Sequence, residues 1–229
     1  MPSSASQLIA LRNKEPFSSG GNRLCFRHPD HSDRCLKVIR PDRTPAIRRA
    51  EKGFPANLRS LNTFDENLVE ESVLRDLHDR YPPEITKHLP RSYGLVATDR
   101  GQAHETDLIC DEDGLISQTL EQYVWHNGLD TTAQSAIREF KQNWSACPPH
   151  TRDLIPHNFV IRLSHAQAQL YLIDGYGRKA RFQGFQKRAM PAARLRRRLE
   201  NFDKRIATVL ERKANNNGPT QRLENLRRD

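Results

Sequence analysis

The sequence predicts an α+β fold of two lobes, in which a strand-rich first lobe contains one long helix and a small second lobe is mostly helical. Three observations lead to this prediction. Short apolar runs separated by turn residues fill most of the first 110 residues, as antiparallel strands require. One amphipathic stretch with helical spacing interrupts them. From about residue 111 helical spacing dominates, and one short pair of strand-like segments lies within it.

The elements of the first lobe follow from turn signals and hydrophobic spacing. A turn-rich stretch, HPDHSD, joins two short strands, which is a hairpin signature. Apolar residues at spacings of three and four then favour a helix, which Pro82 and Pro83 end. In chain order we expect a short apolar segment at Ser6–Arg12, a glycine turn at Pro16–Asn22, strands at Arg23–Arg27 and Arg34–Ile39, a helix from about Asn57 to Arg80, and strands at Ser92–Thr98 and Ala103–Cys110.

The second lobe begins with two helices that Asn127 and Gly128 separate, since this pair is a helix stop signal. The last helix carries apolar residues at alternating spacings of four and three, namely Leu195, Leu199, Phe202, Ile206 and Val209. The expected elements are helices at Thr119–Trp125 and Thr131–Ser145, strands near Phe159–Leu163 and Gln169–Ile173, and a basic helix from about Pro191 to Lys213. We expect one domain over residues 6–213, with lobes at about 6–110 and 111–213, and a basic, flexible tail at 214–229.

The chain is basic, with 37 Lys and Arg against 28 Asp and Glu and a formal net charge of +9. Residues 178–229 hold 16 of the basic and 5 of the acidic side chains, so the rest of the chain is close to neutral. The basic side chains of the last helix could bind nucleic acid, anionic lipid or an acidic protein, or form a solvated face. They are Arg194, Arg196, Arg197, Arg198, Lys204, Arg205, Arg212 and Lys213. Because no aromatic residues alternate with them for base stacking, no specific nucleic-acid partner is expected.

The composition also excludes several classes of protein. No segment reaches the 18 or more apolar residues of a transmembrane helix, and the first residues lack the apolar core of a signal peptide. The four cysteines form no dense framework, so we expect reduced thiols and a cytoplasmic location.

The segment Thr151–Asn158, with the sequence TRDLIPHN, is the most informative part of the chain. It places Asp153 five residues before Asn158. A second aspartate, Asp174, directly follows the apolar run LYLI and precedes a glycine. Phosphoryl transfer needs such residues, because one carboxylate orients the attacking hydroxyl while hard oxygen ligands hold Mg²⁺. We expect Asp153 in the catalytic role and Asn158 and Asp174 as magnesium ligands.

These motifs resemble those of the protein-kinase superfamily. TRDLIPHN is similar to the catalytic loop HRDLxxxN, and IDG is similar to the metal-binding DFG. The resemblance implies that Lys37, in the strand motif CLKV, holds the phosphates of ATP. It also implies that Gly20 and Gly21 belong to a loop over these phosphates, where glycine permits close backbone approach.

The same resemblance implies a helix glutamate that pairs with Lys37. Glu70 fits this position because it lies three and four residues before Val73 and Leu74, at the edge of the apolar stripe. Glu71 is the alternative, since a one-residue error in helical phase would exchange the two.

A longer set of segments resembles the small bacterial YrbL family, whose members are associated with the PhoP regulatory network and look like reduced kinases. The segments are GGNRLCFRHPDHSDRCLKVIRP, LPRSYGLVATDRG, TLEQYV, IPHNFVIR and LYLIDGYG, and the resemblance covers about residues 6–205. It implies a bilobal protein-kinase-like fold and a phosphotransferase that uses ATP and Mg²⁺. Only 55 residues follow Asp174, too few for the substrate platform of a protein kinase. A small-molecule or cell-envelope acceptor therefore fits better than a protein, and the nearby basic residues favour an anionic acceptor.

The sequence departs from the kinase pattern at several positions. Thr151 replaces the loop histidine, Gly175 stands where DFG has phenylalanine, and Ile155 stands where Ser/Thr protein kinases have a lysine. The glycine turn also lacks the full GxGxxG spacing. The alternative function is therefore a pseudokinase-like regulatory protein that binds nucleotide or a partner without catalysis.

A second candidate site competes within the first hairpin. Cys25, His28, His31 and Cys35 are spaced as the ligands of a tetrahedral zinc site can be. The alternative interpretation makes the cysteines small core residues and the histidines part of a turn. Both interpretations stay open at the level of sequence.

Overall fold

The structure is a computed structural model that describes residues 8–152, 154–165, 167–177 and 190–215. It confirms the α+β class. The chain divides into two compact units: unit 1 holds the residues up to Arg75 and Arg91–Leu108, and unit 2 holds Asp76–Pro90 and the residues from Ile109 onward. Within the described ranges, no helix is both long and apolar enough to cross a membrane.

Unit 1 is built on a five-stranded antiparallel sheet in the order β1-β2-β3-β5-β4. Its strands are β1 (Ser18–Ser19), β2 (Arg23–Arg27), β3 (Arg34–Ile39), β4 (Ser92–Thr98) and β5 (Gly101–Asp107). The expected bounds of β2, β3 and β4 coincide with the observed ones. Strand β5 begins earlier than expected, because Thr98 pairs directly with Gly101 across the turn, and Gly101 takes a φ of 103° that glycine tolerates.

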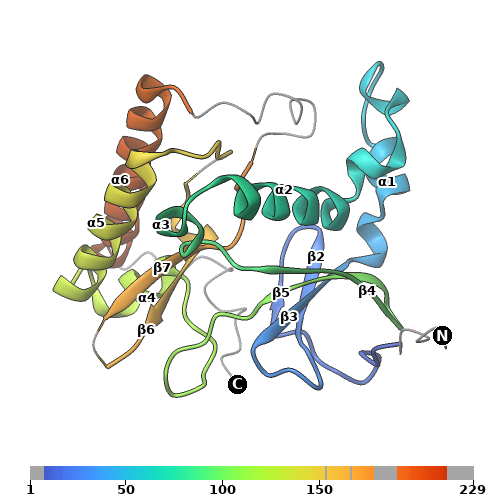
Figure 1. The fold of residues 1–229 in the computed structure, drawn as a ribbon, viewed down its shortest axis with the longest axis horizontal. Helices are drawn as coiled ribbons and strands as arrows, with labels where there is room; N and C mark the ends of the chain where they lie inside the picture. The colour runs from blue at the N-terminus through green and yellow to red at the C-terminus, as the bar shows by residue number, and fades with distance from the viewer. Residues whose placement is uncertain (1–7, 153, 166, 178–189, 216–229) are drawn as a thin grey trace. The chain divides into compact units, whose positions relative to one another are not determined.

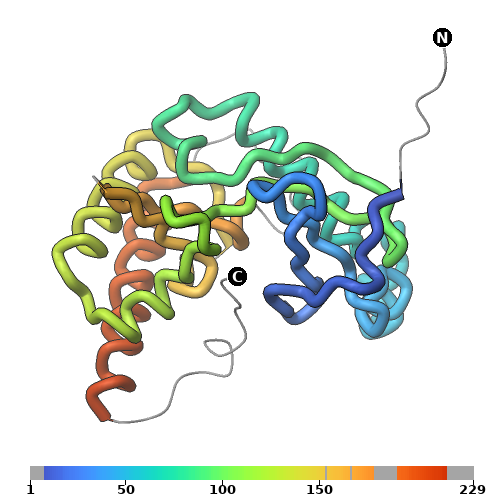
Figure 2. The backbone as a smooth tube through the Cα atoms, turned by 90° about the horizontal axis from the view of Figure 1, so that it is seen from below, coloured from blue at the N-terminus to red at the C-terminus, as the bar shows by residue number. Residues whose placement is uncertain are grey.

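The two faces of this sheet differ in chemistry. One face carries the apolar core of the unit, formed by Leu11, Phe26, Leu36, Val38 and Ala103. The N-terminal segment covers this face and lies beside the β4–β5 turn (Figure 2). Two hydrogen bonds hold it there: the Ile9 N–H donates to the Ala97 carbonyl (3.0 Å), and the Leu11 N–H donates to Asp99 Oδ1 (2.7 Å). Strand alternation turns Lys37 to the opposite face, where helix α2 lies.

Helix α2 (Glu66–Arg80; Figure 1) is the helix expected in the first lobe, and its residues from Asp76 onward belong to unit 2. It begins later than the expected Asn57. Asp65 determines the start, because its Oδ1 accepts from the N–H groups of Asn67 (2.9 Å) and Leu68 (3.2 Å), as a helix cap does. The preceding stretch forms short helices that the apolar spacing did not indicate, namely η1 (Pro41–Arg43), α1 (Pro45–Ala50), η2 (Ala56–Leu58) and η3 (Leu61–Phe64).

Unit 2 is mostly helical, with one antiparallel strand pair. Its elements are α3 (Pro83–Thr86), α4 (Leu120–Asn127), α5 (Thr131–Ala146), η4 (Pro156–Asn158), β6 (Phe159–Leu163), β7 (Ala168–Leu172) and α6 (Ala192–Ala214). Local capping starts two of the helices: Thr119 and Gln122 form a reciprocal capping box, and Asp130 Oδ1 accepts from the Ala133 N–H at 2.8 Å. The predicted helices and strands of this lobe are therefore present within a few residues.

An aromatic cluster forms the core of unit 2. The ring of Phe140 lies 4.9 Å from Phe159 and 5.0 Å from Trp144, and Phe202 of α6 packs 4.9 Å from Phe159. The apolar stripe of α6 therefore faces inward as expected, although Leu199 is only half-buried.

Candidate functional site

The sheet of unit 1 and helix α2 together bury an ion pair. Lys37 on β3 donates a hydrogen bond to Glu70 on α2, and the two residues are 8% and 7% exposed. Glu71 points elsewhere, since it pairs with Arg75 one turn further along the helix at 2.9 Å. Of the two glutamates that the sequence left open, the structure brings Glu70 to the lysine.

Arg23 on β2 is the residue of this cluster that the sequence analysis missed. Its guanidinium pairs with the second carboxylate oxygen of Glu70 and lies 3.7 Å from Glu66. The hairpin register could have indicated it, because Arg23 lies two residues before Cys25, which is opposite Lys37, and so shares its face. Two cations therefore meet one buried carboxylate.

Asn67 fixes the helix against the strands at this point. Its side-chain amide donates to the backbone carbonyls of Lys37 (2.9 Å) and Gln102 (3.1 Å), and Asn67 itself is 1% exposed. Because Asn67 and Glu70 are three residues apart on one helix face, these hydrogen bonds also position the Glu70 carboxylate above β3.

The ion pair keeps both partners charged. Burial raises the pKa of Glu70, but the attraction of Arg23 and Lys37 outweighs it and leaves the pKa well below its usual range. Burial alone would lower the pKa of Lys37, and the Glu70 carboxylate raises it above the ordinary value. Beside them, burial lowers the pKa of His104 to about 4, so its ring is neutral at pH 7. The cluster thus keeps an excess of positive charge.

The glycine turn at Gly20 and Gly21 lies between β1 and β2. The Gly20 N–H donates to the Arg23 carbonyl at 2.9 Å and closes the turn. A Cβ atom on Gly20 would meet only that carbonyl oxygen, at 3.6 Å, and one on Gly21 would meet nothing within 4 Å. Neither backbone takes a left-handed φ. The space beside these two glycines is therefore open, as the close approach of a ligand would require.

The hairpin residues proposed for zinc separate onto different sides of the sheet. Cys25 and Cys35 share the face of Lys37, and their thiols hydrogen-bond to each other. His28 lies instead near Glu105, at 3.8 Å, which strand alternation places on the opposite face. In the part of the chain that the structure describes, no group of three or more His, Cys, Asp or Glu side chains could hold a metal ion. The cysteines are free thiols.

The cysteine pair lowers the pKa of one thiol. The hydrogen bond from Cys35 lowers the pKa of Cys25 to about 7 against the opposing effect of burial, and the charges of Lys37 and Arg23 add to the lowering. The pKa of Cys35 rises correspondingly. Cys25 therefore carries substantial thiolate at neutral pH.

Unit 2 brings the second set of predicted residues together. Asn158 ends η4 directly before β6, and Asp174 follows β7, its hairpin partner. The Ile173 N–H donates to the Asn158 carbonyl at 2.8 Å. The two candidate magnesium ligands therefore lie at neighbouring ends of the paired strands β6 and β7. Asp153 lies outside the described residues, and the adjacent Arg152 is described.

A short backbone ladder joins the loop before Asp153 to the residues after Asp174. The Arg152 N–H donates to the Gly175 carbonyl and the Gly177 N–H to the His150 carbonyl, both at 2.7 Å. Gly175 has a φ of 83°, a conformation that a residue with a side chain, such as phenylalanine, rarely adopts.

The Asp174 carboxylate is half exposed and already has partners. Its Oδ1 accepts from Arg152 Nη2 at 3.1 Å and from the Gly175 N–H at 2.5 Å. The oxygen atoms of Asp174 and of the Asn158 amide are of the kind that Mg²⁺ prefers as ligands. A Mg²⁺ ion at the Asp174 carboxylate would, however, compete with the guanidinium of Arg152.

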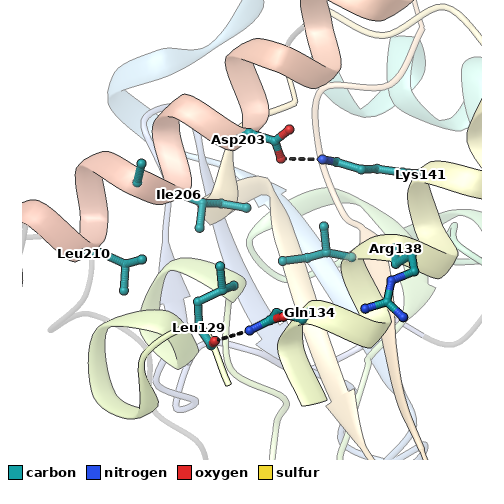
Figure 3. A pocket seen from close by; sticks show the side chains of 9 residues that line it. Leu129, Gln134, Arg138, Lys141, Asp203, Ile206 and Leu210 are labelled. Carbon is teal, nitrogen blue, oxygen red and sulfur yellow. Dashed lines mark hydrogen bonds and ion pairs between the residues drawn. The ribbon is translucent and has the colours of Figure 1, made fainter. Parts of the chain in front are cut away.

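A separate pocket lies between α5 and α6 in unit 2 (Figure 3). Leu129, Ile137 and Ile206 form its apolar lining, and Lys141 pairs with Asp203 at its edge. None of the described candidate residues lines it. The pocket therefore adds nothing to the candidate site.

Comparison with known proteins finds relatives over most of the chain. Residues 9–207 match the family described as PhoP regulatory network protein YrbL. The chain is 30% identical over 174 residues to the uncharacterized protein YrbL of Escherichia coli (strain K12), and equally to that of Shigella flexneri, with 74% of each chain covered. The chain therefore belongs to the PhoP regulatory network protein YrbL family.

Proposed function

We propose that the protein is an ATP- and Mg²⁺-dependent phosphotransferase of reduced, bilobal kinase-like fold, with a small-molecule or cell-envelope acceptor. The buried Lys37–Glu70 pair carries the proposal. A lysine ammonium is costly to bury, and a salt bridge is a poor way to gain stability, so an internal pair between a strand and a helix suggests a functional role.

The residues present suit both implied cofactors. Arg23, Lys37 and Arg48 outnumber the carboxylates of Glu66 and Glu70 that they pair with, and this surplus of positive charge favours phosphate oxygens. Asn158 and Asp174 supply the hard oxygen atoms that Mg²⁺ prefers. When bound, ATP with Mg²⁺ supplies the transferable phosphoryl group and neutralises its charge.

Each residue has a proposed role. Lys37 binds the α- and β-phosphates, and Glu70 orients the Lys37 ammonium. Asn158 and Asp174 bind the metal. Asp153 orients the hydroxyl of the acceptor and accepts its proton.

Nucleotide binding is tested by thermal shift with ATP, with and without Mg²⁺. Lys37→Met should weaken ATP binding by at least about tenfold, because it removes a phosphate ligand. The control is Lys52→Met, which removes an exposed lysine of the same unit. Asp174→Asn should remove the Mg²⁺-dependent part of the shift, whereas Asp203→Asn, at a half-exposed carboxylate, should not. Wild-type protein that ATP does not stabilise would contradict the proposal.

Catalysis needs its own test, because binding alone fits a regulatory protein too. Incubation of γ-labelled ATP with the protein and fractionated cell extract should label an acceptor. Asp153→Ala should abolish this transfer and leave ATP binding nearly unchanged. Equal transfer by the wild type and by Asp153→Ala would show that Asp153 is not the catalytic carboxylate.

One observation favours a second candidate, a pseudokinase-like regulator of a PhoP-type network. Arg152 neutralises the Asp174 carboxylate from within the chain, which removes much of its attraction for a metal. In this case Arg152→Gln should increase the Mg²⁺-dependent thermal shift. ATP binding without label transfer, in wild type and in Arg152→Gln, would support the regulator over the enzyme.

A further inference from the structure

The segment between β3 and α2 exposes an unusual amount of apolar surface. Residues 41–64 fold into η1, α1, η2 and η3, and among them only Phe64 is buried. Helix α1 packs against the other three short helices, so the segment forms one small module. Figure 1 shows it in light blue to cyan, beyond the N-terminal end of α2. The module thus folds by local contacts and adds little to the core.

Four large apolar side chains of this module face solvent. Phe54 is 83% exposed, Leu58 74%, Leu61 41% and Ile47 40%. Over the described residues, just three other large hydrophobic side chains are exposed, and they lie on separate elements. Single exposed hydrophobic residues are ordinary, but four within 15 positions indicate a surface that an apolar partner, such as a protein or a lipid bilayer, covers.

The charges of the module indicate that the partner is anionic. Between Arg43 and Arg59 there are five basic side chains and one acidic side chain, Glu51. Arg43 pairs with Glu51 at 2.8 Å, and Arg48 is used internally, with the Phe64 carbonyl at 2.6 Å. The positive surplus is therefore carried by Arg49, Lys52 and Arg59, which flank the apolar residues in sequence.

We propose that residues 43–61 of this module form a docking surface for an anionic phospholipid bilayer. Phe54 and Leu58 enter the boundary between head groups and acyl chains, while Arg49, Lys52 and Arg59 contact the lipid phosphates. A bilayer accepts apolar side chains that are spread over short helices, whereas a protein partner needs a shaped groove or continuous face. This surface goes beyond the proposed phosphotransfer and does not depend on it.

Vesicle co-sedimentation with the full-length chain tests the proposal. The probes are vesicles of pure phosphatidylcholine and vesicles with about 30 mol% phosphatidylglycerol, an anionic lipid. Wild-type protein should bind the anionic vesicles, and raising the salt from about 0.1 M to about 0.5 M should weaken binding severalfold by screening. Phe54→Ser with Leu58→Ser should reduce the partition coefficient by about tenfold or more.

Matched variants distinguish this surface from others on the chain. Leu8→Ser with Leu115→Ser also removes two exposed apolar side chains, of 59% and 38% exposure, and should leave binding unchanged. Neutralising Arg49, Lys52 and Arg59 to Gln should weaken binding to anionic vesicles. The same change at Arg194, Arg196 and Arg197 of α6 should have the smaller effect. All variants should unfold close to the temperature of the wild type, because each altered side chain is at least partly exposed.

Three results would overturn the proposal. The first is a wild-type protein that does not bind anionic vesicles at low salt. The second is vesicle binding that survives the change at Phe54 and Leu58 and is lost on neutralising α6. The third is a wild-type oligomer, measured by light scattering, that the Phe54 and Leu58 changes dissociate, which would assign the surface to a second copy of this chain.

Discussion

Lys37 on β3 and Glu70 on α2 form a buried ion pair, although 33 residues separate them in the chain. The strand contributes the cation and the helix the anion, and both are charged at neutral pH because each offsets the cost of burying the other. The same carboxylate also holds Arg23, which lies 3.7 Å from Glu66 as well, so Glu70 is the anion that the two buried cations share. This sharing determines how the site responds to mutation and to pH.

Glu70→Gln should destabilise the protein strongly. Removing the carboxylate charge breaks the buried pair with Lys37 and leaves Arg23 only the more distant Glu66, and breaking a buried pair typically costs about 3–5 kcal/mol. Urea denaturation measures the free energy of unfolding. The matched control is Glu71→Gln, the next residue, whose pair with Arg75 is at the surface and should change stability by less than about 1 kcal/mol. Equal losses in both variants would contradict the central role of Glu70.

His104 should make stability fall as the pH drops below about 6.5. Its pKa is lowered to about 4 in the folded protein, so between these values the unfolded chain binds the proton more readily. Unfolding is then favoured by up to about 3 kcal/mol on acidification. The pKa values of His28 and His88 are lowered as well, so His104→Gln should flatten the pH profile without abolishing its slope. His165→Gln, at a ring that is 92% exposed, should leave the profile as it is.

Glu70 adds a second acid-labile contribution at lower pH. Its folded pKa is depressed, so its stabilising effect is full above the unfolded value of about 4.5 and is lost as the pH falls towards the folded pKa. The two losses should therefore appear in different parts of the unfolding profile.

Cys25 should react with iodoacetamide at neutral pH. The reactive form is the thiolate, so the labelling rate should rise with a midpoint near pH 7, the lowered pKa of this thiol. Cys35→Ser should weaken the hydrogen bond to the Cys25 thiolate and move the midpoint up, and Lys37→Met should do so to a smaller extent. Peptide mapping by mass spectrometry identifies the labelled residue. A midpoint near pH 9 in the wild type would show that the thiol pair does not activate Cys25.

The sequence was most informative where turn residues bracket an element or where apolar spacing continues for several turns. The first condition holds for β2, β3, β4 and β6, whose bounds were predicted residue for residue. Neither condition holds for residues 41–64, where short helices form with almost no burial and a side-chain cap, from Thr44, is present at α1 alone. The polar Asp65, rather than any apolar period, determines where α2 begins.

The candidate site shows the same limit. Helical phase favoured Glu70 but left Glu71 open, and the contact with Lys37 decides between them. Strand alternation allowed Lys37 to face the helix. Arg23 required the pairing register of β2 with β3, which the sequence pattern suggests but does not establish. The tie between Asn67 and two strand carbonyls could not be anticipated, because it depends on where the helix crosses the sheet.

Two glycines of the candidate site should respond differently to substitution by alanine. Gly175 has a φ of 83°, where a Cβ atom is strained, so Gly175→Ala should cost about 1–2 kcal/mol of stability. Gly21 has no left-handed φ and nothing within 4 Å of its Cβ position, so Gly21→Ala should be neutral or slightly stabilising. If Gly21 serves as the approach point of a nucleotide, Gly21→Ala should still weaken ATP binding in the thermal-shift assay. Loss of stability in Gly21→Ala would instead mean that the fold requires this glycine. A neutral Gly175→Ala would show that the backbone at this position does not require glycine.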